Sequence, residues 1–414
     1  MPRKVFAAGV ALFVFFSTRA DATEFLEWAN RTLSIQRNDQ SFDLQLSGLV
    51  DLEGYFIDQR APGLIFTNDS FLFNPRLTLF ADIQWTRHIY LFGQFRADRG
   101  FDPSDYSAEV RADEYFLRYS PFDDSRINFQ IGKFATAVGN WVQRHYSWDN
   151  PFINAPLPYE NLTGIWDSAA PGNVDTLLYW AHVGEYDNGD YSDKYLRLPI
   201  IWGPSYTTGF AVFGSFDRFD YAAEIKNGAL ASRPESWDAT EAGFDHPTFS
   251  TRIGVRPSEM WNLGFSASAG PYLLSQAAPT LPPGRSIGDY RELVLGQDIS
   301  FAWHHWQLWA EIYEARFEVP AIGNADTLTY YLEAKYKITP QFFGALRWNQ
   351  QLFGTVRDDD EQVKWGNNVW RVDAAVGYRF TNYLQAKLQY SFTHQDAQLQ
   401  VGEQLVAAQL TLKF

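Results

Sequence analysis

The chain has no cysteine and only two methionines among its 414 residues. A protein without cysteine has no disulfide framework, so its stability must come from its secondary structure and packing alone. Basic side chains are also scarce, with 34 Lys and Arg against 49 Asp and Glu and a formal net charge of -15. This acidic balance argues against nucleic acid as a partner.

Long apolar runs are missing as well. The longest one near the start, Val5–Phe16, is about a dozen residues, which is too short to span a bilayer as a helix. It follows the positive pair Arg3 and Lys4 and precedes the small-x-small triplet Ala20–Ala22. This order is typical of a secretory signal peptide, here residues 1–22; the alternative is a buried N-terminal helix. No later stretch reaches about 18 apolar residues, so we predict an exported chain without a helical anchor.

Motifs for enzyme chemistry are absent too. There is no GxSxG elbow, no HExxH pair and no P-loop, and the seven histidines are scattered. His145 near Ser147 is the one pair that a barrel lipase could use. Four oxygen-bearing residues could in principle hold calcium, but their spacing matches no ligand pattern: Asp149, Asn150, Glu160 and Asn161. We therefore predict no catalytic residue, no metal site and no cofactor.

Aromatic residues, in contrast, are abundant, at 17% of the chain with 15 Trp, 22 Tyr and 34 Phe. The last ten residues, Leu405–Phe414, alternate between apolar and mixed side chains, as a strand with two different faces does. The ending on Phe414 resembles the closing strand of bacterial outer-membrane β-barrels. The alternative is the edge strand of a soluble sandwich.

The same alternation recurs along the chain. It begins with Phe42–Phe56, whose length exceeds the usual strand of five or six residues. Further strands are predicted over 71–85, 89–98, 114–119 and 127–131, and from positions near Tyr206, Phe219, Thr248, Trp261, Tyr290, His305, Thr327, Gln341, Asn368, Tyr383 and Glu403. These make sixteen, the even number that bacterial single-chain barrels have. Residues 173–205 could add two strands to give eighteen, but Pro199 argues against a regular strand there.

The connections between these strands alternate between short and long. The long ones lie near 59–70, 99–109, 135–205, 229–247, 275–288, 318–326, 354–367 and 394–403. This asymmetry is typical of outer-membrane barrels, which have short periplasmic turns and longer outer loops. We therefore predict an all-β fold: a transmembrane antiparallel β-barrel of about 16 strands over 42–414, after a periplasmic lead-in or short hairpin over 23–41.

Residues 135–205 are too long for a plain connection and are rich in Trp, Tyr, Phe and Pro. Packed aromatics and prolines favour a loop folded against the inner wall, where it would narrow the lumen. We expect seven residues there: Trp141, Arg144, His145, Trp148, Asp149, Asn150 and Tyr159. The alternative is an outward latch or a contact in a trimer.

Three segments resemble the phosphate-selective porin family. They are Leu33–Phe56, the element Ile131–Phe134 followed by Val138 and Gly139, and the hairpin Gly203–Gly228. The resemblance implies a sixteen-stranded, often trimeric porin of a Gram-negative-type outer membrane, with a pore for small hydrophilic solutes or ions, and it places Lys133 at the entrance to the constriction. The arginine ladder and lysine cluster through which members bind phosphate have no residue-by-residue match here. The resemblance therefore does not assign phosphate, and anions remain one possible solute class.

Strand alternation predicts which charges face the interior. With the apolar face outward, the residues expected to line the pore or its constriction are Arg76, Arg96, Arg126, Lys133, Trp141, Arg144, His145, Arg347, Arg371 and Arg379. The excess acid lies mostly in outer loops such as 358–361. The alternative is that inward charges only pair with one another.

A structural or partner-binding barrel is the other class of function. Outer-membrane lipid, a homotrimer and assembly machinery recognising Phe414 are the expected partners.

Overall fold

The computed structural model describes residues 33–36, 42–59, 61–99, 109–186, 194–397 and 401–414. Sixteen strands of these described residues pair with their neighbours in sequence order, and β19 pairs with β2 to close the barrel. All pairings are antiparallel. The predicted signal peptide, most of the predicted lead-in, and residues 100–108 lie outside the described residues.

Most barrel strands begin within about two residues of the predicted start, whereas β5 and β13 begin earlier than predicted, at Glu109 and Gly323. The barrel strands are β2 (Asp43–Ile57), β3 (Phe71–Gln84), β4 (Ile89–Asp98), β5 (Glu109–Tyr119), β6 (Asn128–Lys133), β7 (Thr208–Phe216), β8 (Phe219–Lys226), β9 (Thr248–Ser258), β10 (Trp261–Pro271), β11 (Arg291–Trp303), β12 (Trp306–Val319), β13 (Gly323–Lys337), β14 (Phe342–Phe353), β17 (Val369–Arg379), β18 (Leu384–Gln395) and β19 (Gly402–Lys413). The prediction of sixteen strands is confirmed.

The alternative of eighteen strands is excluded, and one predicted connection is wrong. The described residues of 173–205 add no strand pair to the barrel, because Val174–Tyr186 forms helix α4. The predicted long connection over 318–326 is a tight turn, because β12 continues to Val319 and β13 already begins at Gly323. A short extra strand, β1 (Ser34–Gln36), pairs with the first residues of β2.

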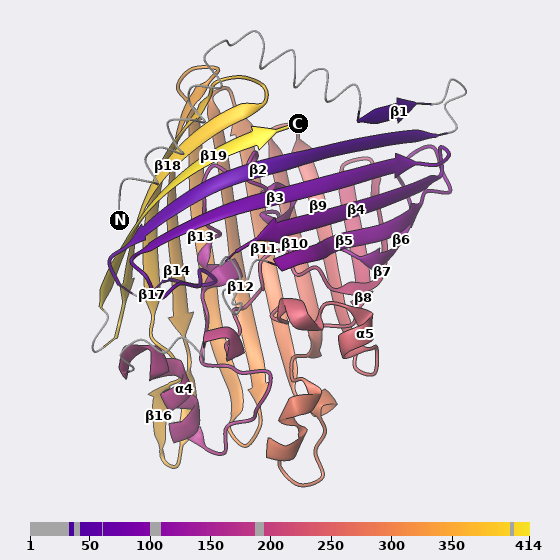
Figure 1. Cartoon of the computed structure of the whole chain (residues 1–414). Coiled ribbons are helices and arrows are strands. Elements are labelled where there is room, and N and C mark those ends of the chain that lie inside the picture. Colours follow the sequence, from indigo (N-terminus) through magenta and orange to yellow (C-terminus); the bar gives the residue numbers. More distant parts are fainter. Residues whose placement is uncertain (1–32, 37–41, 60, 100–108, 187–193, 398–400) are drawn as a thin grey trace.

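The two ends of the barrel differ. One end has all the short turns except the one between β12 and β13, together with β1 and the C-terminal Phe414, and we call it the turn end (Figure 1). The other, the loop end, has α4, helix α5 (Ala239–Ala242) and the hairpin of β15 (Thr355–Asp358) and β16 (Glu361–Lys364). Among the described residues no helix is long and apolar enough to cross a membrane.

Alternation along each strand produces an apolar outer face and a mixed inner face. In β13, for example, Tyr331 and Glu333 are buried, whereas Leu332 between them is 55% exposed. Leu295, Leu346 and Leu388 are exposed on the outer face in the same way. A continuous apolar exterior suits lipid, because a strand in a bilayer needs apolar side chains outside and a paired backbone within the sheet.

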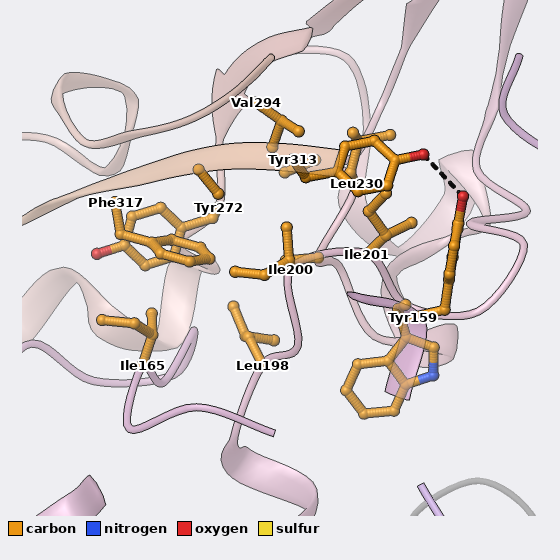
Figure 2. Close-up of a cluster of buried hydrophobic side chains, with 14 of the residues drawn as sticks. Tyr159, Ile165, Leu198, Ile200, Ile201, Leu230, Tyr272, Val294, Tyr313 and Phe317 are labelled. Atoms are coloured by element: carbon orange, nitrogen blue, oxygen red, sulfur yellow. Dashed lines mark hydrogen bonds between the residues drawn. The ribbon is translucent and has the colours of Figure 1, made fainter. Parts of the chain in front are cut away.

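Much of the connection between β6 and β7, in the described residues 134–173 and 194–207, folds back into the barrel, and we call these two stretches the inner loop. It includes the short helices η1 (Val142–Arg144) and α3 (Leu157–Glu160). Its apolar side chains pack against the inner wall in a buried cluster (Figure 2). There Leu198, Ile200 and Ile201 of the loop face Val294 and Phe317 of the wall. Burial of these side chains stabilises the loop inside the barrel.

Candidate functional site: a constricted barrel interior

The inner loop is held first by carboxylates of the wall. Glu311 of β12 accepts hydrogen bonds from the backbone N–H groups of Asn140 and Trp141 and, at 2.6 Å, from the Tyr159 hydroxyl. Glu114 of β5 accepts one from the backbone of Ala135 at 2.8 Å. Hydrogen bonds to a charged acceptor are stronger than neutral ones, and these fix the start of the loop in place.

Cations of the wall hold the next stretch. Lys387 of β18 donates from Nζ to the carbonyl oxygens of Ser147, Asn150 and Phe152 at 2.8, 3.0 and 3.1 Å. Three acceptors match the three donors of an ammonium group. Arg347 of β14 donates to the side-chain oxygen of Asn154 at 2.8 Å. The loop therefore contacts both the β5 wall and the β14–β18 wall and crosses the interior.

A buried ion network joins these strands to the loop. Arg347 lies 2.8 Å from Asp373 and 3.6 Å from Glu333, and none of the three side chains is exposed. Arg144 of the loop reaches Glu333 at 2.5 Å. Arg371 pairs with Asp373 at 3.1 Å and with Glu160 of the loop. Pairing of inward charges with one another therefore describes these three arginines. The side chains of Arg347 and Arg371 have almost no exposed surface, and that of Arg144 is 11% exposed.

A second set of charges retains solvent exposure. Arg76, Arg96 and Arg111 lie on β3, β4 and β5, and their side chains are 11%, 13% and 17% exposed. Each is paired: Arg76 with Asp51 at 3.4 Å, Arg96 with Asp98 at 2.7 Å, and Arg111 with Asp113 at 3.3 Å. We call these six residues the charged band. Alternating signs on a partly wet wall can guide ions of either charge past it.

His145 and Tyr146 of the inner loop lie on the side of the charged band. The Tyr146 hydroxyl donates to Gln94 of β4 at 2.6 Å, and the Tyr206 hydroxyl lies 2.7 Å from Nε2 of His145. Burial, with smaller contributions from the nearby charges of Arg96 and Arg76, lowers the pKa of His145 to about 4. His145 is therefore neutral at ordinary pH.

Cations without an acid partner gather at the turn end. Arg379 lies 5.0 Å from the ring centre of Trp148 and donates to its carbonyl oxygen at 3.1 Å, and Lys413 lies 5.8 Å from the same ring. Lys335 lies 4.4 Å from the ring of Phe343. Within the described parts of the chain, none of these three cations forms an ion pair. They leave this part of the interior locally positive.

Two predicted site residues lie apart from the rest. Arg126 was expected at the constriction, but the structure places it in the turn before β6, where it is 53% exposed and pairs with Asp124 at 2.6 Å. Its position in the alternation is on the inward side, as predicted, but it lies at the turn end, beyond the inner loop. Lys133 is buried and pairs with Asp238 of the α5 connection at 3.1 Å. The ring centres of Trp141 and Tyr159 lie 4.5 Å apart within the inner loop, with the rings tilted by 36°.

The alternative chemistries have no support in the geometry. Both ring nitrogens of His145 are engaged, with the Val142 carbonyl and the Tyr206 hydroxyl, so neither serves Ser147. Glu160 is bound by Arg371 and the Ala155 backbone. No group of three or more potential metal ligands occurs among the residues that the structure describes.

Sequence reasoning missed two important residues. Arg111 fell at the edge of the predicted connection 99–109, because the apolar alternation begins only after it. Glu311 went unnoticed because the inward faces were read for the first and last strands only. Applying the same alternation to β12 would have found it, since Glu311 and Tyr313 are both buried on its inner face.

The closed sixteen-stranded barrel, its apolar exterior and its inner loop define the class of transmembrane β-barrels with a porin fold. Three solved structures are similar to this chain, at TM-scores of 0.56, 0.55 and 0.53 and about 10% identity. They are Salmonella typhi OmpF in complex with daunomycin (92% of this chain, 100% of that chain), the anion-selective porin from Comamonas acidovorans (90% and 100%), and the outer membrane channel DcaP of Acinetobacter baumannii (92% and 99%). At this identity the likeness shows the fold. No family profile and no curated protein sequence matches the chain.

Proposed function

We propose that this protein is an outer-membrane porin that lets small hydrophilic solutes diffuse through a constricted lumen. The observation that carries the proposal is the inner loop, which is pinned to opposite walls of a closed barrel by Glu311, Lys387 and Arg347. A barrel with a purely structural role would not need a fixed, charged loop across its interior. The similar solved structures include proteins named as a porin and as a channel, which supports the same function.

In this proposal the turn end faces the periplasm and the loop end faces the outside, as in outer-membrane barrels with short periplasmic turns. The passage runs between the inner loop and the charged band. Anions are the finer proposal for the solute, because Lys335, Arg379 and Lys413 leave the periplasmic side positive while the band itself is balanced. A homotrimer remains part of the proposal, and light scattering of the purified protein in detergent tests it.

Conductance tests the function directly. The purified protein, inserted in a planar bilayer under a salt gradient, should give ohmic steps with a reversal potential shifted toward anions. Deleting Trp141–Tyr159, the stretch that carries η1 and the Lys387 contacts, should raise the single-channel conductance, because it removes the loop that crosses the interior. A protein that inserts as a folded barrel but never conducts would contradict the proposal.

A structural or partner-binding barrel is the second candidate. It is favoured by the apolar cluster of Figure 2, which fills part of the interior with side chains such as Ile200 and Phe317 instead of water. Such a barrel would show heat-modifiable mobility on a gel but no conductance. The same bilayer experiment therefore separates the two functions.

A further inference from the structure

The interior wall at the turn end of β3, β4, β5 and β7 is aromatic. The inward alternation of these strands places Phe92 directly opposite Phe116, and Tyr90 opposite Arg118. Five rings form this surface, which we call the aromatic wall: Phe80, Tyr90, Phe92, Phe116 and Phe213. None of the five is buried, although they face inward.

The rings of the aromatic wall lie close together. Ring centres are 6.2 Å apart for Phe80 and Phe92 at an interplanar angle of 27°, and 5.2 Å apart for Phe92 and Phe116 at 32°. Tyr146 of the inner loop meets Phe80 edge-on at 5.2 Å. A wet barrel interior is usually polar, and a cluster of partly exposed aromatic side chains marks a binding surface.

Arg118 lies over this surface. Its guanidinium carbon is 5.4, 5.3 and 4.9 Å from the ring centres of Tyr90, Phe116 and Phe213. Its Nε and Nη2 atoms both donate to Oε1 of Gln130, at 3.1 and 2.9 Å. In the described parts of the chain Arg118 forms no ion pair, whereas Arg76, Arg96 and Arg347 each pair with a carboxylate.

We propose that the aromatic wall and Arg118 form a binding site for aromatic monocarboxylates, with benzoate as the simplest one. The carboxylate takes the remaining N–H donors of Arg118, because a planar guanidinium matches a carboxylate with two parallel hydrogen bonds. The ligand ring stacks against Phe92 and Phe80. Two acids lie beside this site. Asp82 accepts a hydrogen bond from the Tyr90 hydroxyl, and Glu114, whose charge acts on Arg118, accepts one from the backbone N–H of Ala135. The proposal names a solute class for the proposed channel. Transport of these solutes rests on the channel function, whereas their binding does not.

Binding is measured by titrating the folded, detergent-purified full chain with benzoate in a calorimeter. Cyclohexanecarboxylate keeps the charge but has a saturated ring, and benzyl alcohol keeps the aromatic ring but not the charge. Both should bind about tenfold more weakly or worse. Arg118→Gln should weaken benzoate binding by about tenfold. Phe92→Leu, which keeps an apolar side chain of similar size, should weaken it by about fivefold. Arg126→Gln, at an exposed arginine of the same end, is the matched control and should bind as the original protein does.

The outcomes separate this site from the channel. Benzoate that binds and also interrupts single-channel current from the turn-end side supports both proposals. Benzoate that binds, with the same dependence on Arg118, to a protein that never conducts overturns the channel and leaves the site standing. Absence of benzoate binding in a conducting protein, or equal binding by Arg118→Gln, overturns the site. Gel mobility before and after heating confirms that each variant is folded.

Discussion

Arg347 and Asp373 face each other across β14 and β17 at 2.8 Å, and neither side chain has exposed surface. Nη2 of Arg347 donates to Asn154 and to the backbone carbonyl oxygen of Ala155 in the inner loop, and Nη1 lies 3.6 Å from Glu333. One wall arginine therefore both completes an ion pair and holds the loop. Its role follows from this geometry: it fixes the inner loop and does not meet solute.

The first prediction concerns the stability of that arrangement. Arg347→Gln should destabilise the barrel by about 3–5 kcal/mol, because removing one partner leaves Asp373 and Glu333 buried without a full counter-charge. Urea unfolding in detergent micelles, followed by tryptophan fluorescence, measures the change. Arg316→Gln is the control: Arg316 pairs with Asp326 at the exposed surface, so its loss should cost about 0–1 kcal/mol. Equal effects for the two variants would contradict the buried network.

The second prediction concerns selectivity. Arg96→Gln should shift the reversal potential toward cations, because Arg96 is a partly exposed member of the charged band in the passage. Neutralising Asp358, Asp359 and Asp360 together should have a smaller effect despite changing three charges. These residues form the β15–β16 turn at the loop end, and charges are largely screened beyond about 8 Å in physiological salt. A larger shift from the triple variant would place the selective region in the outer loops.

The fold could be predicted in detail because lipid and the barrel interior are such different surroundings. Strands predicted near Thr248, Trp261 and Phe219 begin at those residues. Only an apolar outer face and a mixed inner face satisfy both surroundings, so the alternation runs the whole length of each strand. It failed at 318–326, because Pro320, Gly323 and Asn324 are residues typical of loops, whereas β12 continues to Val319 and β13 begins at Gly323.

The contacts inside the barrel were predicted less well, because they join residues that are far apart in the sequence. Alternation correctly turns Arg347 inward, but whether it contacts water depends on Asn154, which is 193 positions away. No local pattern encodes that contact. Arg76 and Arg96 were predicted on the same basis and retain exposure, because the inner loop presents His145 and Tyr146 there without covering them. The alternation in the sequence predicts the direction of a side chain, but its surroundings depend on where the inner loop packs.

The third prediction concerns Phe414. Its backbone N–H and carbonyl both bond to Gly48, at 3.0 and 2.9 Å, and its ring lies against Gly48, which has no side chain to interfere. Phe414→Ala should lower the yield of assembled barrel several-fold if assembly machinery recognises the ring. Once folded, the variant should lose no more than about 2 kcal/mol, since one partly exposed ring contributes little to a sheet of this size. Yield is measured as heat-modifiable protein in the outer-membrane fraction, and stability by urea unfolding. Unchanged yield would remove Phe414 as a recognition element.

The fourth prediction concerns pH and the inner loop. The folded-state pKa of His145 is about 4, below its ordinary value of 6.5, because burial disfavours the charged ring. The displaced loop then binds a proton at His145 more readily than the docked loop. The contribution of His145 to docking therefore weakens as pH falls from about 6.5 toward 4 and is unchanged above 6.5. In bilayer recordings, the single-channel current steps should be larger and noisier at pH 5 than at pH 7.5.

His145→Gln should remove that difference, because a glutamine does not titrate yet can still accept from the Tyr206 hydroxyl. Asp167, whose pKa burial raises to about 6, contributes with the opposite sign, since its docked form gains stability as pH falls. Asp167 is present in both the original protein and the His145→Gln variant, so its effect cancels when the two are compared. His246→Gln, at an exposed histidine outside the inner loop, should keep the original pH response. If His145→Gln responds to acid as the original protein does, another group controls the docking of the loop.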